Sequence, residues 1–174
     1  MMEGKLSFGM PICNLADLPP LLKPGQCLLG LDPGSVVVGV AISDPGLRVA
    51  SPLMGLTRGK FAADAATLAK IIRERAIGGL VIGLPKNMDG TEGPSAQSAR
   101  TFASNLLRFL KALPDNPHDM PAAFWDERFS TAAVTRFMIE GDMSRKRRDA
   151  VVDKAAAAYI LQGALDALTH RATP

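Results

Sequence analysis

The sequence predicts a single α/β domain with a central mixed five-stranded sheet and helices on both faces. Short apolar runs rich in Val, Ile and Leu come first, separated by turn-forming residues, and helical and strand-like stretches then alternate towards the C-terminus. The chain has 174 residues, of which 47% are hydrophobic. This length is enough for one well-buried core and rather short for two.

Five apolar stretches are expected to form the strands. The turn sequences Pro33-Gly34 and Asp44-Pro45-Gly46 separate the first three, which predicts strands joined by tight turns. The fourth follows a predicted helix, and the fifth is a short run that ends in Trp125. The expected strands cover residues 27–32, 36–43, 48–57, 80–84 and 122–125.

Apolar residues at helical spacing predict a helix over residues 61–76, which the pair Gly78-Gly79 is expected to stop. Further helices are expected at about 95–112, 130–140 and 146–169.

Residues 1–25 contain four prolines and no sustained period, so we expect a flexible N-terminal arm. The domain itself is then expected to cover residues 26–170.

The composition argues against several classes of protein. No apolar stretch reaches the roughly 18 residues of a membrane span and no signal sequence is evident, so we expect a cytoplasmic protein without a membrane partner. Cys13 and Cys27 lack metal-binding spacing and are expected to be free thiols. His118 and His170 are too far apart for a histidine-based metal site. The serines lack a nucleophile elbow or a histidine base.

Three separated acidic positions favour a metal site. Asp32 and the pair Asp126-Glu127 each end an apolar run, and Asp153 enters an alanine-rich helix. Carboxylates at buried strand ends need partners, and converging acidic oxygens suit hard divalent cations such as Mg²⁺ or Mn²⁺. The structural alternatives are a turn residue for Asp32 and surface salt bridges for the pair. Asp153 could simply stabilise the start of its helix.

Asp126 and Glu127 are adjacent, and adjacent side chains in a strand point to opposite faces. At most one of them is therefore expected to bind a metal directly. The sequence leaves the choice open, with a preference for Glu127, which is expected to be the ligand only if it shares a face of the sheet end with Asp32.

Two polar segments are candidates for contacting phosphate. The loop 85–94 contains glycines that allow close approach and opens onto a helix N-terminus, which favours anions. Its glycine spacing fits neither a Walker A loop nor a dinucleotide fingerprint. Segment 144–154 has five basic residues and two acidic ones. Its excess of three positive charges equals the net charge of +3 of the whole chain. Either segment could instead be a solvated surface. The candidate substrate-binding residues are Lys86, Asn87, Thr91, Arg128, Arg145, Lys146, Arg147 and Arg148.

Four ordered blocks of the sequence resemble the YqgF/RuvX family. The blocks run from Leu29 to Asp44, Val81 to Pro94, Asp126 to Thr131 and Ser144 to Gly163. The resemblance implies a ribonuclease H-like fold related to RuvC-type resolvases. It also implies the activity of a Holliday junction resolvase or of a nuclease that matures the 5′ end of pre-16S ribosomal RNA.

The resemblance assigns roles residue by residue. Asp32 matches the acid of the first strand, Glu127 or Asp126 matches the acid after the later strand, and Asp153 matches the acid of the C-terminal helix. One departure concerns Val36-Val37, where the family commonly has basic residues.

Together these observations predict hydrolysis of RNA phosphodiesters by one or two Mg²⁺ or Mn²⁺ ions that Asp32, Glu127 or Asp126, and Asp153 hold. The expected nucleic-acid partner is precursor ribosomal RNA in preference to branched DNA. The pre-ribosomal small subunit is a further possible partner. The protein could be a monomer or a homodimer, and a symmetric dimer would favour junction resolution. The valines at 36 and 37 point to a third possibility, a non-catalytic ribosome-assembly factor that binds nucleic acid.

Overall fold

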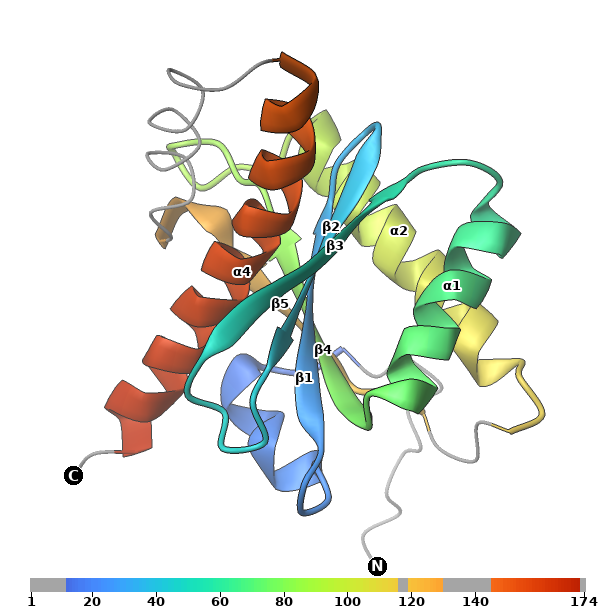
Figure 1. Ribbon diagram of the computed structural model, residues 1–174. Coiled ribbons are helices and arrows are strands. Elements are labelled where there is room, and N and C mark those ends of the chain that lie inside the picture. Colours follow the sequence, from blue (N-terminus) through green and yellow to red (C-terminus); the bar gives the residue numbers. More distant parts are fainter. Residues whose placement is uncertain (1–11, 116–118, 130–144, 173–174) are drawn as a thin grey trace, which may run out of the picture.

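The protein is described by a computed structural model that covers residues 12–115, 119–129 and 145–172 (Figure 1). A five-stranded sheet with the strand order β3-β2-β1-β4-β5 lies between two helical layers. Figure 1 shows α4 across one face of the sheet, with α1 and α2 together on the other face. The predicted fold class, a mixed five-stranded sheet with helices on both faces, is therefore confirmed.

The strands follow the predicted apolar runs. β1 and β2 form an antiparallel hairpin in which Asp32 pairs with Gly39, and β3 continues this arrangement on the far side of β2. β4 is parallel to both β1 and β5, so these three strands end at the same edge of the sheet. The bounds are β1 Cys27–Pro33, β2 Val37–Ser43, β3 Ala50–Thr57, β4 Ile77–Leu84 and β5 Ala122–Asp126.

The helices also lie close to their predicted positions, and the predicted helix at 130–140 falls outside the described residues. The three described α-helices are α1 Phe61–Glu74, α2 Pro94–Lys111 and α4 Arg145–Ala172. Short 3₁₀ turns occupy η1 Leu15–Asp17, η2 Pro19–Leu21 and η3 Glu127–Phe129. None of the helices in the described part of the chain has the length and apolar character to cross a membrane.

The predicted helix stop at Gly78-Gly79 is wrong. α1 ends at Glu74, and Ala76 makes the left-handed turn with a φ of 52°, while both glycines lie inside β4. Their role is close packing: a Cβ at Gly78 would collide with the side chain of Gln26, and one at Gly79 would lie 3.0 Å from Leu28 Cδ2.

Alternate residues of β1 serve two separate cores. Leu29 and Leu31 pack with α1 and α2, whereas Leu28 belongs to the core beneath α4. Gly30 faces α4 as well, because a Cβ there would lie 2.8 Å from Leu161 Cβ and 3.2 Å from the carbonyl oxygen of Ala157. The glycine thus lets α4 lie directly on the sheet.

Residues 12–25, which we expected to belong to a flexible arm, form two 3₁₀ turns against the sheet. Leu18 between these turns is completely buried in the core beneath α4. The backbone N–H of Cys13 donates to the carbonyl oxygen of Ala122 at 2.8 Å, which ties the segment to β5. One apolar residue among prolines creates no periodic pattern, so the sequence did not indicate this burial.

Cys13 and Cys27 are free thiols, as expected. Burial raises the pKa of both thiols, with a smaller contribution from Asp17 at Cys13 and from Asp44 at Cys27. The two thiols therefore stay in the protonated form at neutral pH.

Candidate metal and nucleic-acid site

Asp32 lies at the end of β1, on the face that α4 covers. Leu28 and Gly30 both face α4, and Asp32 continues this alternation two residues further on. The backbone N–H of Gly34 donates to the carbonyl oxygen of Asp32 at 2.9 Å and closes a tight turn directly after the strand. The predicted position of Asp32, at a strand end facing a turn, matches the structure.

Glu127 lies on the same face as Asp32. It follows β5 directly, and its Oε1 would be 2.5 Å from a Cβ built on Gly83. That same Cβ would also meet Ile160 Cδ1 of α4 at 2.8 Å, so the Glu127 carboxylate occupies the α4 side of the sheet. The absence of a side chain at Gly83 provides the space for this carboxylate.

Asp32 and Gly83 stand at the same level of the sheet, because Leu31 pairs with Ile82 one residue earlier in each strand. Neighbouring strands are about 4.8 Å apart. The carboxylate of Glu127, over Gly83, is therefore one strand away from Asp32. Oxygen ligands at this spacing suit a hard divalent cation.

The third predicted acid, Asp153, lies in α4, but its side chain falls outside the described part of the structure. The same is true of the side chains of Arg145, Lys146, Arg147 and Arg148. Among the side chains that the structure does describe, no group of three or more metal-ligating residues gathers in one place. The described part of the site thus consists of the carboxylate of Asp32 on β1 and that of Glu127, which follows β5 and lies over Gly83 of the intervening strand β4.

Asp126 points to the other face of the sheet, where Phe124 packs into the core beneath α1 and α2. Its carboxylate accepts hydrogen bonds from Arg128 Nη2 at 2.7 Å and Arg128 Nε at 3.1 Å. The Arg128 guanidinium holds the pKa of Asp126 below its usual range, with a smaller contribution from the charge of Lys86. The structure therefore separates the two adjacent acids and pairs Asp126 with an arginine.

Arg128 also contacts the loop between β4 and α2, which was a predicted phosphate-binding segment. Arg128 Nη1 donates to the carbonyl oxygen of Met88 at 3.3 Å, and a Cβ on Gly90 would be 3.5 Å from the same nitrogen. Gly90 has a φ of 88°, a conformation that glycine adopts without strain. Arg128 thus lies against this loop and links it to the end of β5.

Asn87 and Thr91, both predicted to contact substrate, are hydrogen-bonded to each other within this loop. Asn87 Nδ2 donates to Thr91 Oγ1 at 2.9 Å, and Thr91 Oγ1 donates to Asp89 Oδ1 at 2.6 Å. The hydrogen bonds from Thr91 lower the pKa of Asp89. These side chains define the shape of the loop, while Lys86 at its start contributes positive charge near Asp126 and Glu92.

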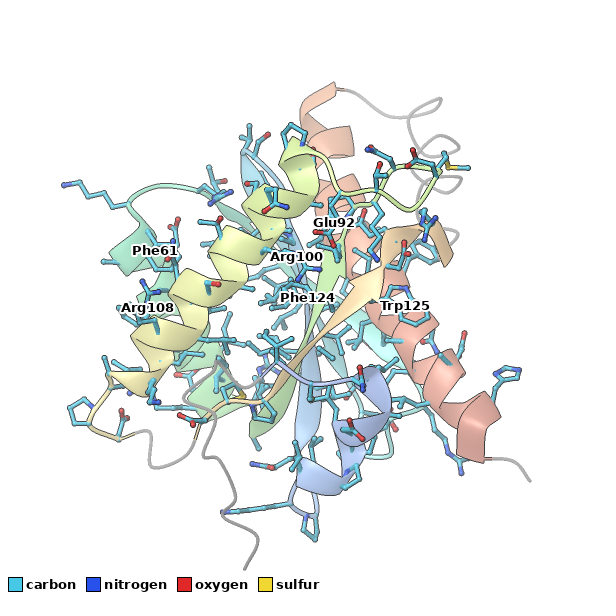
Figure 2. The ribbon with its side chains drawn as sticks, turned by 180° about the vertical axis from the view of Figure 1, so that it is seen from behind. Phe61, Glu92, Arg100, Arg108, Phe124 and Trp125 are labelled. Carbon is cyan, nitrogen blue, oxygen red and sulfur yellow. The ribbon has the colours of Figure 1, made fainter. Side chains whose placement is uncertain are left out.

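A salt bridge anchors the far end of the loop to α2. Arg100 donates two hydrogen bonds to Glu92, at 2.6 and 2.8 Å, and these lower the pKa of Glu92. The Arg100 guanidinium also lies 4.9 Å from the centre of the Phe124 ring in β5 (Figure 2). The loop is therefore held in its middle by Arg128 and at its α2 end by Arg100.

The comparisons with known proteins agree with this architecture. The family model described as RuvX, Holliday junction resolvase, matches residues 26–167. A protein of Paracoccus denitrificans is 58% identical over 159 residues, which cover 90% of this chain and 95% of the relative. A protein of Rhodospirillum centenum is 55% identical over 159 residues, which cover 91% of this chain and 83% of the relative. Both relatives are named as candidate pre-16S rRNA nucleases.

A solved structure of RuvC from T. thermophilus, in complex with a Holliday junction substrate, shares the fold. The TM-score is 0.51 at 14% sequence identity, and the match covers 83% of this chain and 96% of that chain. The expected ribonuclease H-like fold of RuvC-type resolvases is thereby confirmed. Because the family model matches most of the sequence and relatives share more than half of their residues with it, the chain belongs to the RuvX family.

Proposed function

We propose that the protein is a metal-dependent nuclease that hydrolyses RNA phosphodiesters and processes the 5′ end of pre-16S ribosomal RNA. The observation that supports this proposal most directly concerns Asp32 and Glu127, which come from distant parts of the sequence. Both lie on one face of the sheet and at the same level of its end. The names of the relatives support the nuclease activity and its RNA substrate. Such an enzyme would act on the pre-ribosomal small subunit in the cytoplasm, as a monomer or a homodimer.

The proposed metal ligands are Asp32 and Glu127, with Asp153 as the third. Asp153 precedes Ala157 by about one helical turn, roughly 6 Å along α4, and the carbonyl oxygen of Ala157 lies against Gly30 of β1. Acidic oxygen donors fit Mg²⁺ or Mn²⁺. A bound ion would activate water for attack on phosphorus and stabilise the charge on the leaving oxygen.

The remaining residues of the site position the nucleic acid. Lys86 lies at the start of the loop that Arg128 and Arg100 fix, and α2 begins behind this loop at Pro94 without a side-chain cap. Uncapped N–H groups at a helix start favour a phosphate. We assign the basic run of Arg145 to Arg148 to backbone contacts, which hold a strand in place without selecting its sequence.

A direct assay tests this proposal. The purified full-length protein is incubated with a labelled precursor rRNA fragment that carries a 5′ extension, and separately with a four-way DNA junction, each with Mg²⁺, Mn²⁺ or EDTA. We expect metal-dependent cleavage of the RNA and none in EDTA. Paired cuts in the junction without RNA cleavage would instead establish the resolvase activity that the family description prints. Binding without cleavage of either substrate would indicate an assembly factor.

Replacing Arg145, Lys146, Arg147 and Arg148 together by Ala should weaken RNA binding and make its salt dependence shallower. Each lost phosphate contact on a single strand lowers the slope of log K against log salt by about 0.7, because fewer counterions are released. The measurement is a salt titration of RNA affinity. A matched control replaces four other basic residues by Ala. These residues lie at the C-terminal ends of α1 and α2: Lys70, Arg73, Arg75 and Lys111. Equal slopes for the two quadruple variants would contradict the assignment.

A further inference from the structure

Arg58, the first residue after β3, reaches the turn that follows Asp32. Its Nη1 donates to the carbonyl oxygen of Gly34 at 2.9 Å, and its backbone N–H donates to the carbonyl oxygen of Val36 at 2.8 Å. Gly34 in turn donates its N–H to the carbonyl oxygen of Asp32 at 2.9 Å. Two hydrogen bonds of Gly34, one to its carbonyl oxygen and one from its N–H, therefore link Arg58 with the backbone of Asp32.

The Arg58 side chain is itself held in place by aromatic residues. Its guanidinium lies 5.4 Å from the centre of the Phe102 ring of α2, within the range of a cation–π interaction. Phe102 is almost completely buried and packs edge-on against Phe61 of α1, with 6.2 Å between the ring centres. Arg58 thus connects the turn after β1 to a rigid part of the core.

The backbone next to Arg58 is fixed as well. The N–H of Gly59 donates to the carboxylate of Asp64, with distances of 3.0 and 3.3 Å to its two oxygens. Asp64 is a buried residue of α1 and points back to the segment between β3 and α1. Both the main chain and the side chain of Arg58 are therefore fixed in positions from which they donate hydrogen bonds to the turn after β1.

We propose that Arg58 is a positioning residue for Asp32. It fixes the carbonyl of Gly34, keeps the turn closed and so directs the carboxylate of Asp32 towards the position of Glu127. This inference rests on the proposed nuclease function. An arginine suits the role because its planar guanidinium can stack on Phe102 while one N–H is directed at the carbonyl oxygen. Lysine can supply the charge and one hydrogen bond, but not the planar stacking.

The test compares Arg58→Gln and Arg58→Lys with the control Arg73→Gln, which removes an exposed arginine from the far end of α1. We expect Arg58→Gln to lower kcat on a labelled precursor rRNA fragment about 10- to 100-fold, as is typical when the support of a metal ligand is lost. KM should stay within about threefold of the wild-type value, because substrate contacts are intact. Arg58→Lys should recover part of the lost kcat, and Arg73→Gln should match the wild type.

Two further measurements do not need turnover. Amide hydrogen exchange at Gly34 should be at least about tenfold faster in Arg58→Gln under conditions where the variant remains folded, because the turn opens more often. Calorimetric titration with Mn²⁺ alone should show that Arg58→Gln binds the ion more weakly than the wild type. The affinity should fall by about the same factor as kcat. If the wild type cleaves neither nucleic acid, the proposed function fails, while these two measurements still decide the role of Arg58.

Several outcomes would overturn the assignment. A raised KM with unchanged kcat and a shallower salt slope would make Arg58 a substrate contact. Unchanged exchange at Gly34, or Mn²⁺ binding at wild-type strength, would show that the turn does not depend on Arg58.

Discussion

Asp32→Asn, Glu127→Gln and Asp153→Asn are each expected to lower the nuclease rate more than about 100-fold with the fold intact. Loss of residues that only support metal ligands costs 10- to 100-fold, and a direct ligand should cost more. Each substitution keeps the volume of the side chain and removes one charge. The rate is measured on the labelled precursor rRNA fragment at saturating Mg²⁺, and thermal unfolding verifies that each variant is folded.

Asp126→Asn is the matched control for Glu127→Gln, because the two residues are adjacent in the sequence. Asp126 faces the α1 and α2 side and is paired with Arg128, so we expect a much smaller loss of rate. The substitution should mainly reduce stability at neutral pH. The lowered pKa of Asp126 means that its contribution is present above the unfolded pKa of about 3.9 and is lost as pH falls through the folded value. A variant at position 126 that is as inactive as Asp32→Asn, beside a nearly normal Glu127→Gln, would reverse the assignment.

Gly83→Ala is expected to reduce the rate about as much as Glu127→Gln. The added Cβ would lie 2.5 Å from Glu127 Oε1 and 2.8 Å from Ile160 Cδ1, so the carboxylate must leave its position over β4. Overpacking should also lower the free energy of unfolding by about 1–3 kcal/mol. The measurements are kcat on the RNA fragment and the midpoint of thermal unfolding.

Gly30→Ala separates the two effects of that substitution. Its Cβ would lie 2.8 Å from Leu161 Cβ on the same face of the sheet, so it also crowds α4, and among the described side chains its three nearest atoms belong to Leu161 and Ala157 and not to a carboxylate. We expect a similar loss of stability with a nearly normal rate for the folded protein. Equal loss of rate in both glycine variants would show that crowding of α4, and not displacement of Glu127, explains the effect of Gly83→Ala.

The sequence predicted most of the sheet because its strands are dense in apolar residues and are separated by strong turn formers. β1, β2 and β5 match their expected ranges to within one residue at each end. It failed at Gly78-Gly79, where glycines that usually end a helix instead allow close packing inside β4. It also missed Leu18, whose burial depends on its contact with distant segments.

For the site, the sequence indicated which residue types were available but not how they face one another. Asp32 could be placed because proline and glycine follow it directly. The choice between Asp126 and Glu127 depended on which face of β5 is covered by α4, and that is a property of the assembled sheet. The proposed role of Arg58 had no local signal, because a lone arginine after a strand resembles any solvated charge.

The parallel pairing of β4 with both β1 and β5 has a consequence for how the enzyme matures. The hairpin of β1 and β2 can form from a short stretch of chain, but Glu127 reaches Asp32 only after β5 has paired with β4. Contacts between such distant segments form slowly during folding. A polypeptide still being synthesised would therefore hold Asp32 in an inactive hairpin, and cleavage could begin only after β5 and Glu127 have been synthesised and have joined the sheet. For a nuclease whose proposed substrate is ribosomal RNA, this order of folding would protect the ribosome that makes it.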